Sequence, residues 1–145
     1  MRIAGALVLV LALVAGGARA GERCATATLD AARALAERAA GFLAASGPDV
    51  ALPRFMNREG GYVAGDLYVF VFDLDGRLRA SGGWPETVGA RIGDGASSGI
   101  YARMRRLALD AGKGWVEYSW YNPCTRQMEP KASYIVRVGD FIVGV

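Results

Sequence analysis

The aromatic run at residues 114–123, with the sequence GWVEYSWYNP, constrains the fold more than any other part of the chain. Its side chains alternate between two faces, with one set, Val116, Tyr118 and Trp120, opposite the other, Trp115, Glu117 and Ser119. A period of two is typical of a half-buried strand. A second β-rich run, residues 133–138, follows a polar connection flanked by two prolines. The two runs predict an antiparallel hairpin with a long loop.

A long amphipathic helix is expected near the amino terminus, over residues 30–46. Thr26 or Thr28 can cap its first turn, and Gly47 with Pro48 supplies a stop. Small or apolar residues recur there at helical spacing, namely Leu29, Ala32, Ala36, Ala39 and Leu43. Because alanine is small, this helix can lie close against another layer.

The middle of the chain predicts a second group of strands and a second helix. Residues 66–73 are apolar on both faces and predict one central strand, followed by a turn and a returning strand at residues 77–81. A short helical turn is expected within residues 49–61. Residues 82–99 are glycine-rich and predict a long connection, after which a helix runs from Ser98 to Gly112. A last strand at residues 141–145 completes an α+β order, with the first helix backing the sheet.

Composition excludes several classes of function. The chain has 145 residues, which is about one domain, and 52% of them are hydrophobic. It contains no histidine, so neither histidine-based nucleophilic catalysis nor the commonest transition-metal ligand is available. With its two cysteines far apart, no zinc site is expected. We therefore expect no enzyme, no metal and no cofactor.

Residues 1–20 resemble a signal peptide. A basic start at Arg2 precedes an apolar run, and Ala18-Arg19-Ala20 fits the small-x-small cleavage rule. We expect cleavage after Ala20 and export to the periplasm or the medium, with no membrane span in the mature domain at residues 21–145. The alternatives are an uncleaved membrane anchor and, less favoured, a lipid anchor at Cys24.

The expected export affects both the net charge of the mature chain and the expected state of its two cysteines. The formal charge of +3 falls to +1 when Arg2 and Arg19 are removed, so nothing predicts a nucleic acid partner. In an oxidising compartment Cys24 and Cys124 are expected to form a disulfide, the alternative being two unpaired thiols.

Three runs in order resemble the single Cache domain, a PAS-like extracytoplasmic sensor module of bacterial receptors that also occurs as free-standing exported proteins. They are residues 65–76, residues 114–123 and residues 129–134. The resemblance covers nearly all of the mature chain. It implies a five-stranded antiparallel sheet with a long amino-terminal helix, a second helix before the third strand, and a small-ligand pocket on the opposite sheet face. Related chains often carry a histidine where this one has Ser81, so a ligand contact from that position is not carried over.

Lys131 is the leading candidate for ligand binding, because a single cation beside aromatic walls suits a small anion. Tyr134 or Tyr118 could donate a hydrogen bond to the same carboxylate. The pocket walls are expected to include Trp120, Tyr68 and Phe70. The alternatives are a lysine paired with Glu129 or Glu117, aromatic residues that are plain core, and Arg79 as a second cation.

Besides an enzyme, the least favoured class because no base and nucleophile can be assigned, two function classes remain open. One is an exported sensory module that binds a small carboxylate or a similar metabolite, with a membrane receptor or a second copy of the chain as its partner. The other is a structural or protein-interaction module with the same fold and no ligand. A pocket filled by the chain's own side chains would favour the second class.

Overall fold

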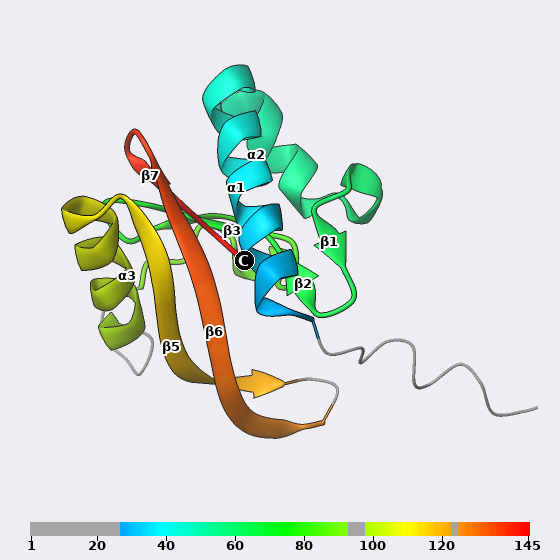
Figure 1. The fold of residues 1–145 in the computed structure, drawn as a ribbon. Coiled ribbons are helices and arrows are strands. Elements are labelled where there is room, and N and C mark those ends of the chain that lie inside the picture. Colours follow the sequence, from blue (N-terminus) through cyan, green and yellow to red (C-terminus); the bar gives the residue numbers. More distant parts are fainter. Residues whose placement is uncertain (1–26, 93–97, 123–124) are drawn as a thin grey trace, which may run out of the picture.

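The computed structural model describes residues 27–92, 98–122 and 125–145 (Figure 1). The expected signal peptide and both cysteines lie outside these residues. The helices in the described part are α1 (Leu29–Ser46), α2 (Pro48–Met56) and α3 (Ser98–Asp110). The strands are β1 (Val63–Ala64), β2 (Leu67–Tyr68), β3 (Phe70–Asp73), β4 (Leu78–Ser81), β5 (Lys113–Asn122), β6 (Gln127–Val138) and β7 (Phe141–Gly144).

The first helix forms where the sequence predicts it. The Thr28 Oγ1 accepts a hydrogen bond from the Ala31 backbone N–H at 3.1 Å and caps the first turn. Gly47 ends the helix with φ of 76°, a conformation that favours glycine. The short turn expected within residues 49–61 is instead a nine-residue helix, α2. It starts at Pro48, because proline is well suited to the first position of a helix, where its missing N–H has no partner to lose.

The single strand predicted at residues 66–73 is wrong, because the run divides at Val69. β2 pairs with β1 in a separate two-stranded sheet, whereas β3 pairs with β4 and β7. The Val69 N–H donates to the Tyr62 carbonyl, and the Val69 carbonyl accepts from the Gly82 N–H. Both backbone groups of Val69 are therefore satisfied outside a regular ladder, and the chain changes partners there.

The aromatic run and the run after it do form an antiparallel hairpin, β5–β6, with Tyr118 opposite Lys131. The long loop predicted for it is wrong, since pairing continues to Asn122 and Gln127. Pro130 is tolerated inside β6 because β7 pairs only with Ile135–Val138, which leaves the outer edge of β6 open at Pro130.

The main sheet is five-stranded and antiparallel, as expected from the resemblance, and its strand order is β4-β3-β7-β6-β5. α1 and α2 cover one face, and α3 packs on the other against β5 (Figure 1). The core is accordingly divided into two hydrophobic clusters. The α1 cluster includes Val71, Val143 and Phe55, and the α3 cluster includes Phe72, Met104 and Ile142.

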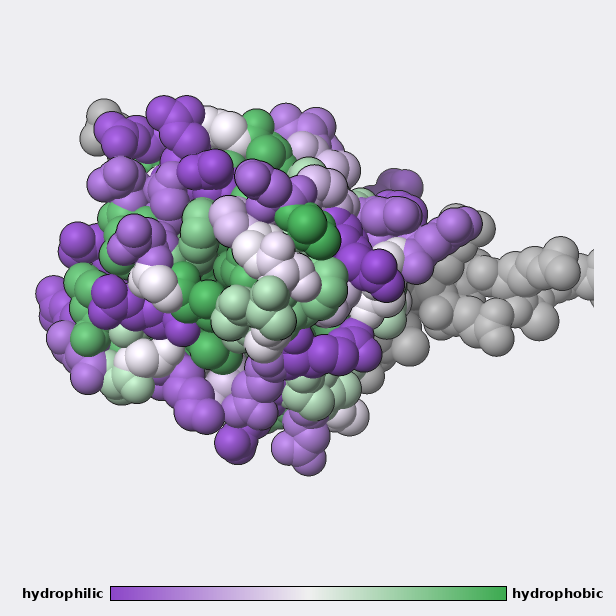
Figure 2. Space-filling model, turned by 90° about the horizontal axis from the view of Figure 1, so that it is seen from above, coloured by the Kyte–Doolittle hydropathy of each residue, from purple (hydrophilic) through white to green (hydrophobic). Residues whose placement is uncertain are grey.

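The surface is mixed in polarity. Seen from above, hydrophilic residues surround several apolar areas (Figure 2). Large apolar side chains that remain exposed include Leu29, Val50 and Met128, which lie on different elements.

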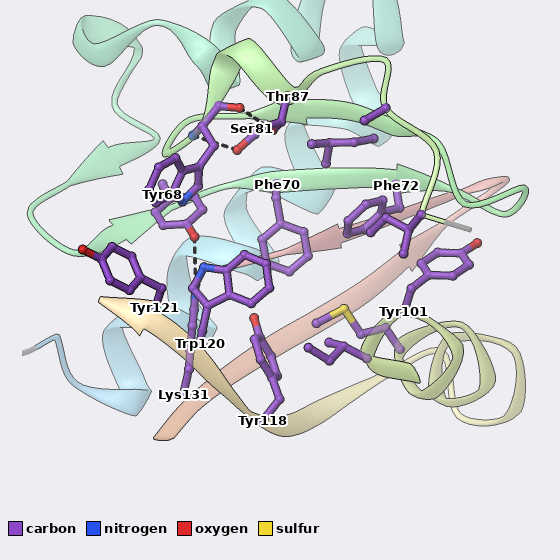
Figure 3. A pocket seen from close by; sticks show the side chains of 16 residues that line it. Tyr68, Phe70, Phe72, Ser81, Thr87, Tyr101, Tyr118, Trp120, Tyr121 and Lys131 are labelled. Atoms are coloured by element: carbon purple, nitrogen blue, oxygen red, sulfur yellow. Dashed lines mark hydrogen bonds between the residues drawn. The ribbon is translucent and has the colours of Figure 1, made fainter. Parts of the chain in front are cut away.

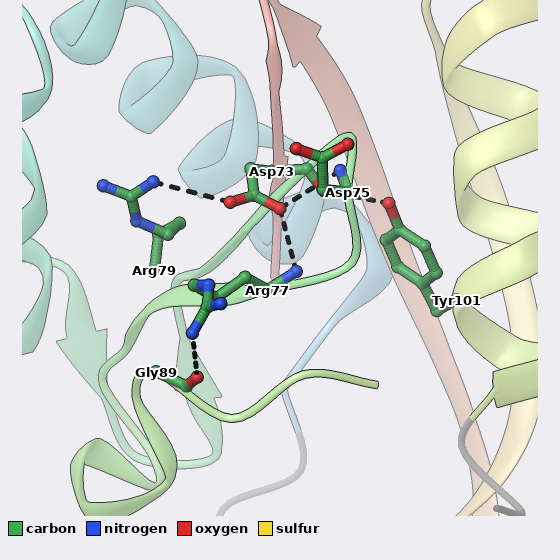
Figure 4. Close-up of polar contacts among 6 residues, drawn as sticks. All are labelled: Asp73, Asp75, Arg77, Arg79, Gly89 and Tyr101. Carbon is green, nitrogen blue, oxygen red and sulfur yellow. Dashed lines mark hydrogen bonds and ion pairs between the residues drawn. The ribbon is translucent and has the colours of Figure 1, made fainter. Parts of the chain in front are cut away.

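The turn after β3 is held by Asp73, which also anchors α3 (Figure 4). The Asp73 Oδ1 accepts from the backbone N–H groups of Asp75 and Arg77, at 3.1 and 2.8 Å. The Tyr101 hydroxyl of α3 donates to the Asp73 carbonyl at 2.8 Å. Arg79 pairs with the other oxygen of Asp73 at 3.4 Å. These contacts fix the position of α3 relative to the sheet, and they give the Asp73 carboxylate a structural role in the turn.

We predict opposite effects from two glycine-to-alanine changes. An added Cβ at Gly144 would overlap the ring of buried Phe70, so Gly144→Ala should lower the free energy of unfolding by about 1–3 kcal/mol. Gly41→Ala lies on the exposed side of α1 with open space around it, so it should raise that free energy by about 0.5–1 kcal/mol. Urea unfolding followed by circular dichroism measures both. Equal stabilities for the two variants would contradict the close packing of β7 against Phe70.

Candidate functional site

A cavity of about 380 Å³ lies on the sheet face that carries α3 (Figure 3). β2, β3, β4, β5 and β6 contribute to its lining, together with α3 and the connection from β4 to α3. This is the face on which the resemblance to Cache domains places the ligand pocket. Its size falls in the range of sites that hold small molecules.

The floor of the cavity follows from strand alternation. Phe70 and Phe72 project from β3 into this face, whereas Val69 and Val71 pack in the α1 cluster. On β5 the same alternation places Tyr118 and Trp120 in the lining. The set of β5 residues predicted to share a face with Val116 therefore lies on the α3 side of the sheet.

The walls come from segments whose role in the site the sequence did not indicate. α3 contributes Tyr101 and Met104, and the connection after β4 contributes Trp84 and Ala90. Two side-chain hydroxyls shape that connection: the Ser81 Oγ accepts from the Trp84 N–H at 3.0 Å, and the Thr87 Oγ1 donates to the Trp84 carbonyl at 2.6 Å. The apolar face of α3 was visible in the sequence, but whether it faced core or cavity was not.

Lys131 stands at one end of the cavity, half-buried, beside Tyr68 (Figure 3). Its Nζ donates to the Tyr68 hydroxyl at 3.0 Å and lies 4.5 Å from the centre of the Tyr68 ring. Within the described part of the chain, Lys131 forms no ion pair with Glu129, Glu117 or any other carboxylate. One of its three N–H donors is engaged by Tyr68, so the ammonium can still contact an anion.

Glu129, two residues before Lys131 on β6, is engaged elsewhere. Its carboxylate accepts from the Asn122 Nδ2 at 2.7 Å. Hydrogen bonds from Thr125 and Asn122 lower the pKa of Glu129, so this carboxyl is ionised at neutral pH.

Tyr118 supplies a hydroxyl next to the ammonium. Its oxygen lies 2.8 Å from the Ser133 Oγ, and Ser133 is fully buried. Burial raises the pKa of Tyr118, and nearby Lys131 opposes that rise only in part, so the phenol keeps its proton at neutral pH. If the serine hydroxyl donates to Tyr118, the phenol proton is available for a third group.

Five of the six predicted ligand-binding residues line the cavity, namely Lys131, Tyr118, Trp120, Tyr68 and Phe70. The structure separates Tyr134 from them. It is buried on the α1 side, with its ring 5.0 Å from that of Trp115 and the guanidinium of Arg33 5.5 Å above it. Tyr134 is three positions from Lys131 on one strand, so the two must face opposite sides. That signal was present in the sequence.

Arg79, the second candidate cation, does not line the cavity. It pairs with Asp73 and lies over the ring of Phe141, 5.9 Å from its centre. Of the described residues that line the cavity, Lys131 alone is charged.

A wider groove of about 1010 Å³ adjoins the cavity. It runs between the start of α1, the β1–β2 hairpin and the far end of the β5–β6 hairpin. Tyr68, Tyr118, Trp120 and Lys131 line both hollows. Lys131 therefore stands at the boundary between the cavity and the groove.

Ranges 27–92, 98–122 and 125–145 contain no group of three acids, cysteines or histidines placed to hold a metal ion. Nor does any helix in these ranges have both the length and the apolar character needed to cross a bilayer.

The fold has solved relatives among sensor domains. A periplasmic sensor domain of a chemotaxis protein is 23% identical, with a TM-score of 0.54 over 79% of this chain and 85% of that one. A methyl-accepting chemotaxis protein from Vibrio parahaemolyticus is 16% identical, with a TM-score of 0.62 over 79% and 84%. A Cache chemosensory domain described as recognising carboxylic acids is 21% identical, with a TM-score of 0.55 over 79% and 84%.

In sequence, no protein-family model and no curated protein matches the chain. The likeness in structure extends over 79% of this chain. It confirms the fold that the three sequence runs implied. The chain has the fold of periplasmic chemotaxis sensor domains, a Cache domain among them.

Proposed function

We propose that this protein is an exported sensory module that binds a small carboxylate in the cavity beside Lys131. The observation that carries the proposal is a half-buried ammonium without an ion pair in the described chain, at the end of a cavity with aromatic walls. Removing an ammonium from water is costly unless an anion or hydrogen-bond acceptors compensate. The Tyr68 hydroxyl and ring compensate in part, and a ligand carboxylate would complete the compensation.

The two tyrosines suit the same ligand. Tyr118 keeps its proton at neutral pH because burial raises its pKa, so it can donate to a carboxylate oxygen. Tyr68 already accepts from Lys131 and can donate its own proton to the ligand. A carboxylate with two oxygens would then receive charge-assisted and neutral hydrogen bonds at one end of the cavity.

The alternative, a structural or interaction module, has less support. That reading predicts a pocket filled by the chain's own side chains, whereas the described side chains leave a volume of about 380 Å³. Catalysis has no support from the residues: the chain has no histidine, and Asp73 is occupied in a turn. The solved neighbours are named as chemotaxis sensors and receptors.

Export and the disulfide belong to the same proposal. Two of the solved neighbours are described as a periplasmic sensor domain and a methyl-accepting chemotaxis protein, which accords with a leader at residues 1–20. Ala27 and Asn122, which flank the segments that carry Cys24 and Cys124, line one groove. A Cys24–Cys124 bond would connect the start of α1 to the end of β5.

The two lysines of the chain provide a matched test. Lys131→Met removes the cation but keeps a long apolar side chain, and it should weaken binding of short carboxylates by about 10- to 100-fold. Isothermal titration with a series from acetate to hexanoate measures the loss. Lys113→Met is the control, because Lys113 is exposed on β5 and pairs with Glu37 at 3.3 Å. Equal affinity in the two variants would reject the role of Lys131.

A second matched pair tests the phenol. Tyr118→Phe should weaken the same binding by about tenfold, since one hydrogen bond to a charged acceptor is lost. Tyr134→Phe makes the same change on the α1 face and should leave affinity at the wild-type value. If Tyr134→Phe were the damaging variant, the ligand would lie on the wrong face for this proposal.

The proposed disulfide can be tested separately from ligand binding. Thiol labelling of the denatured, exported protein should find no free cysteine without reductant and two after reduction. Labelling of both cysteines before reduction would show that the pair is unbonded, and the binding proposal would be unaffected.

A further inference from the structure

The cavity has two chemically different ends. Lys131, Tyr68 and Tyr118 form one end, and Phe72 and Tyr101 lie toward the other (Figure 3). Met104 and Leu78, both buried in the α3 cluster, also line it. A ligand with its anionic group at Lys131 would therefore have the rest of its body against apolar walls.

Three hydroxyl groups of the lining away from Lys131 make hydrogen bonds within the protein. The Tyr101 hydroxyl donates to the Asp73 carbonyl, and the Thr87 hydroxyl donates to the Trp84 carbonyl. The Ser81 Oγ accepts from the Trp84 N–H. These residues accordingly offer a ligand few unused donors, and their contacts serve the shape of the wall.

Charge in the cavity is confined to one end. Among the lining residues that the structure describes there is no carboxylate, and Lys131 is the one cation. The acids Glu117 and Glu129 line the outer groove, with Glu129 held by Asn122. A second charge at the far end of a ligand would find no charged partner among these described lining residues, which is strongly unfavourable for either sign where water is excluded.

The volume of the cavity also indicates the size of the ligand. About 380 Å³ corresponds to roughly a dozen water molecules at about 30 Å³ each. Acetate would leave most of the apolar wall in contact with water. A longer or bulkier apolar body gains affinity with every methylene that it buries.

We infer that the ligand is a monocarboxylate with a bulky apolar body, and that dicarboxylates and ω-amino acids are excluded from the cavity. This inference rests on the proposed function. The carboxylate lies at Lys131 and Tyr118. The body extends past Trp120 and Phe70 toward Phe72 and Met104.

Three ligands of equal chain length test the exclusion: hexanoate, adipate and 6-aminohexanoate. All three have six carbons, and the far carbon is a methyl in hexanoate, a carboxylate in adipate and a methylene that carries an ammonium in 6-aminohexanoate. Titration calorimetry on the full mature chain should show hexanoate binding, with the other two about 100-fold weaker or more. From propanoate to hexanoate, affinity should rise about fourfold per methylene.

The outcomes separate the two proposals. If adipate or 6-aminohexanoate binds as well as hexanoate, or if affinity does not rise with length, the inference on ligand class is overturned while carboxylate binding stands. If no member of the set binds, the proposed function fails, and the inference fails with it.

A pair of variants in the connection after β4 tests the placement of the body. Ala90 lines the cavity, and two backbone hydrogen bonds fix its position. Its N–H donates to the Thr87 carbonyl, and its carbonyl accepts from the Leu78 N–H. Ala90→Phe should reduce the cavity and weaken hexanoate at least about tenfold while sparing propanoate. Val88→Phe, which introduces the same side chain at an exposed site outside the lining, should alter neither. Unchanged hexanoate affinity in Ala90→Phe would overturn the placement.

Discussion

Strand alternation divides this core into two layers that are covered unequally, and the site depends on that inequality. Along β3, Val71 packs toward α1, and Phe70 and Phe72 pack toward α3. The α1 side is closed by an 18-residue helix rich in alanine, together with α2. The other side has a 13-residue helix anchored beside the β3 turn by Tyr101. Aromatic residues that would be core under a longer helix instead line a cavity.

The cation at the end of that cavity is stabilised in part by the aromatic side chain of Tyr68. Lys131 is placed by its register with Tyr118, and its ammonium contacts the hydroxyl and ring of Tyr68. Both contacts are compatible with an added anion, since a phenol can accept one hydrogen bond and donate another. The aromatic walls contribute contact area and exclude water, which strengthens a charge-assisted hydrogen bond formed inside. In the proposed function, the head group and the apolar body of the ligand would be recognised at opposite ends of this cavity.

Local patterns predicted the elements well and their partners less well. The alanine spacing and the Thr28 cap were enough for α1, and the alternation at residues 114–123 was enough for β5. The break at Val69 was not predictable from propensity, because Tyr62 and Gly82 satisfy its backbone from other segments. The length of β6 was missed because prolines usually end strands, whereas Pro130 lies where the neighbouring strand has stopped. Tyr134 was grouped with Lys131 although their spacing along one strand assigns them to opposite faces.

The amino-acid sequence by itself determined which side chains share a face, the absence of histidine chemistry, and the presence of one lysine among aromatic residues, because these depend on composition and on the period of a strand. Only the tertiary structure decided which face is left open. It brought Trp84, Ala90 and Met104 from distant segments against β3 and β5, and it brought the Tyr68 hydroxyl to the Lys131 ammonium across 63 positions of the chain. The physical reason is that a cavity forms where helices and loops leave part of the sheet surface uncovered. Where that happens depends on how these segments pack around the sheet.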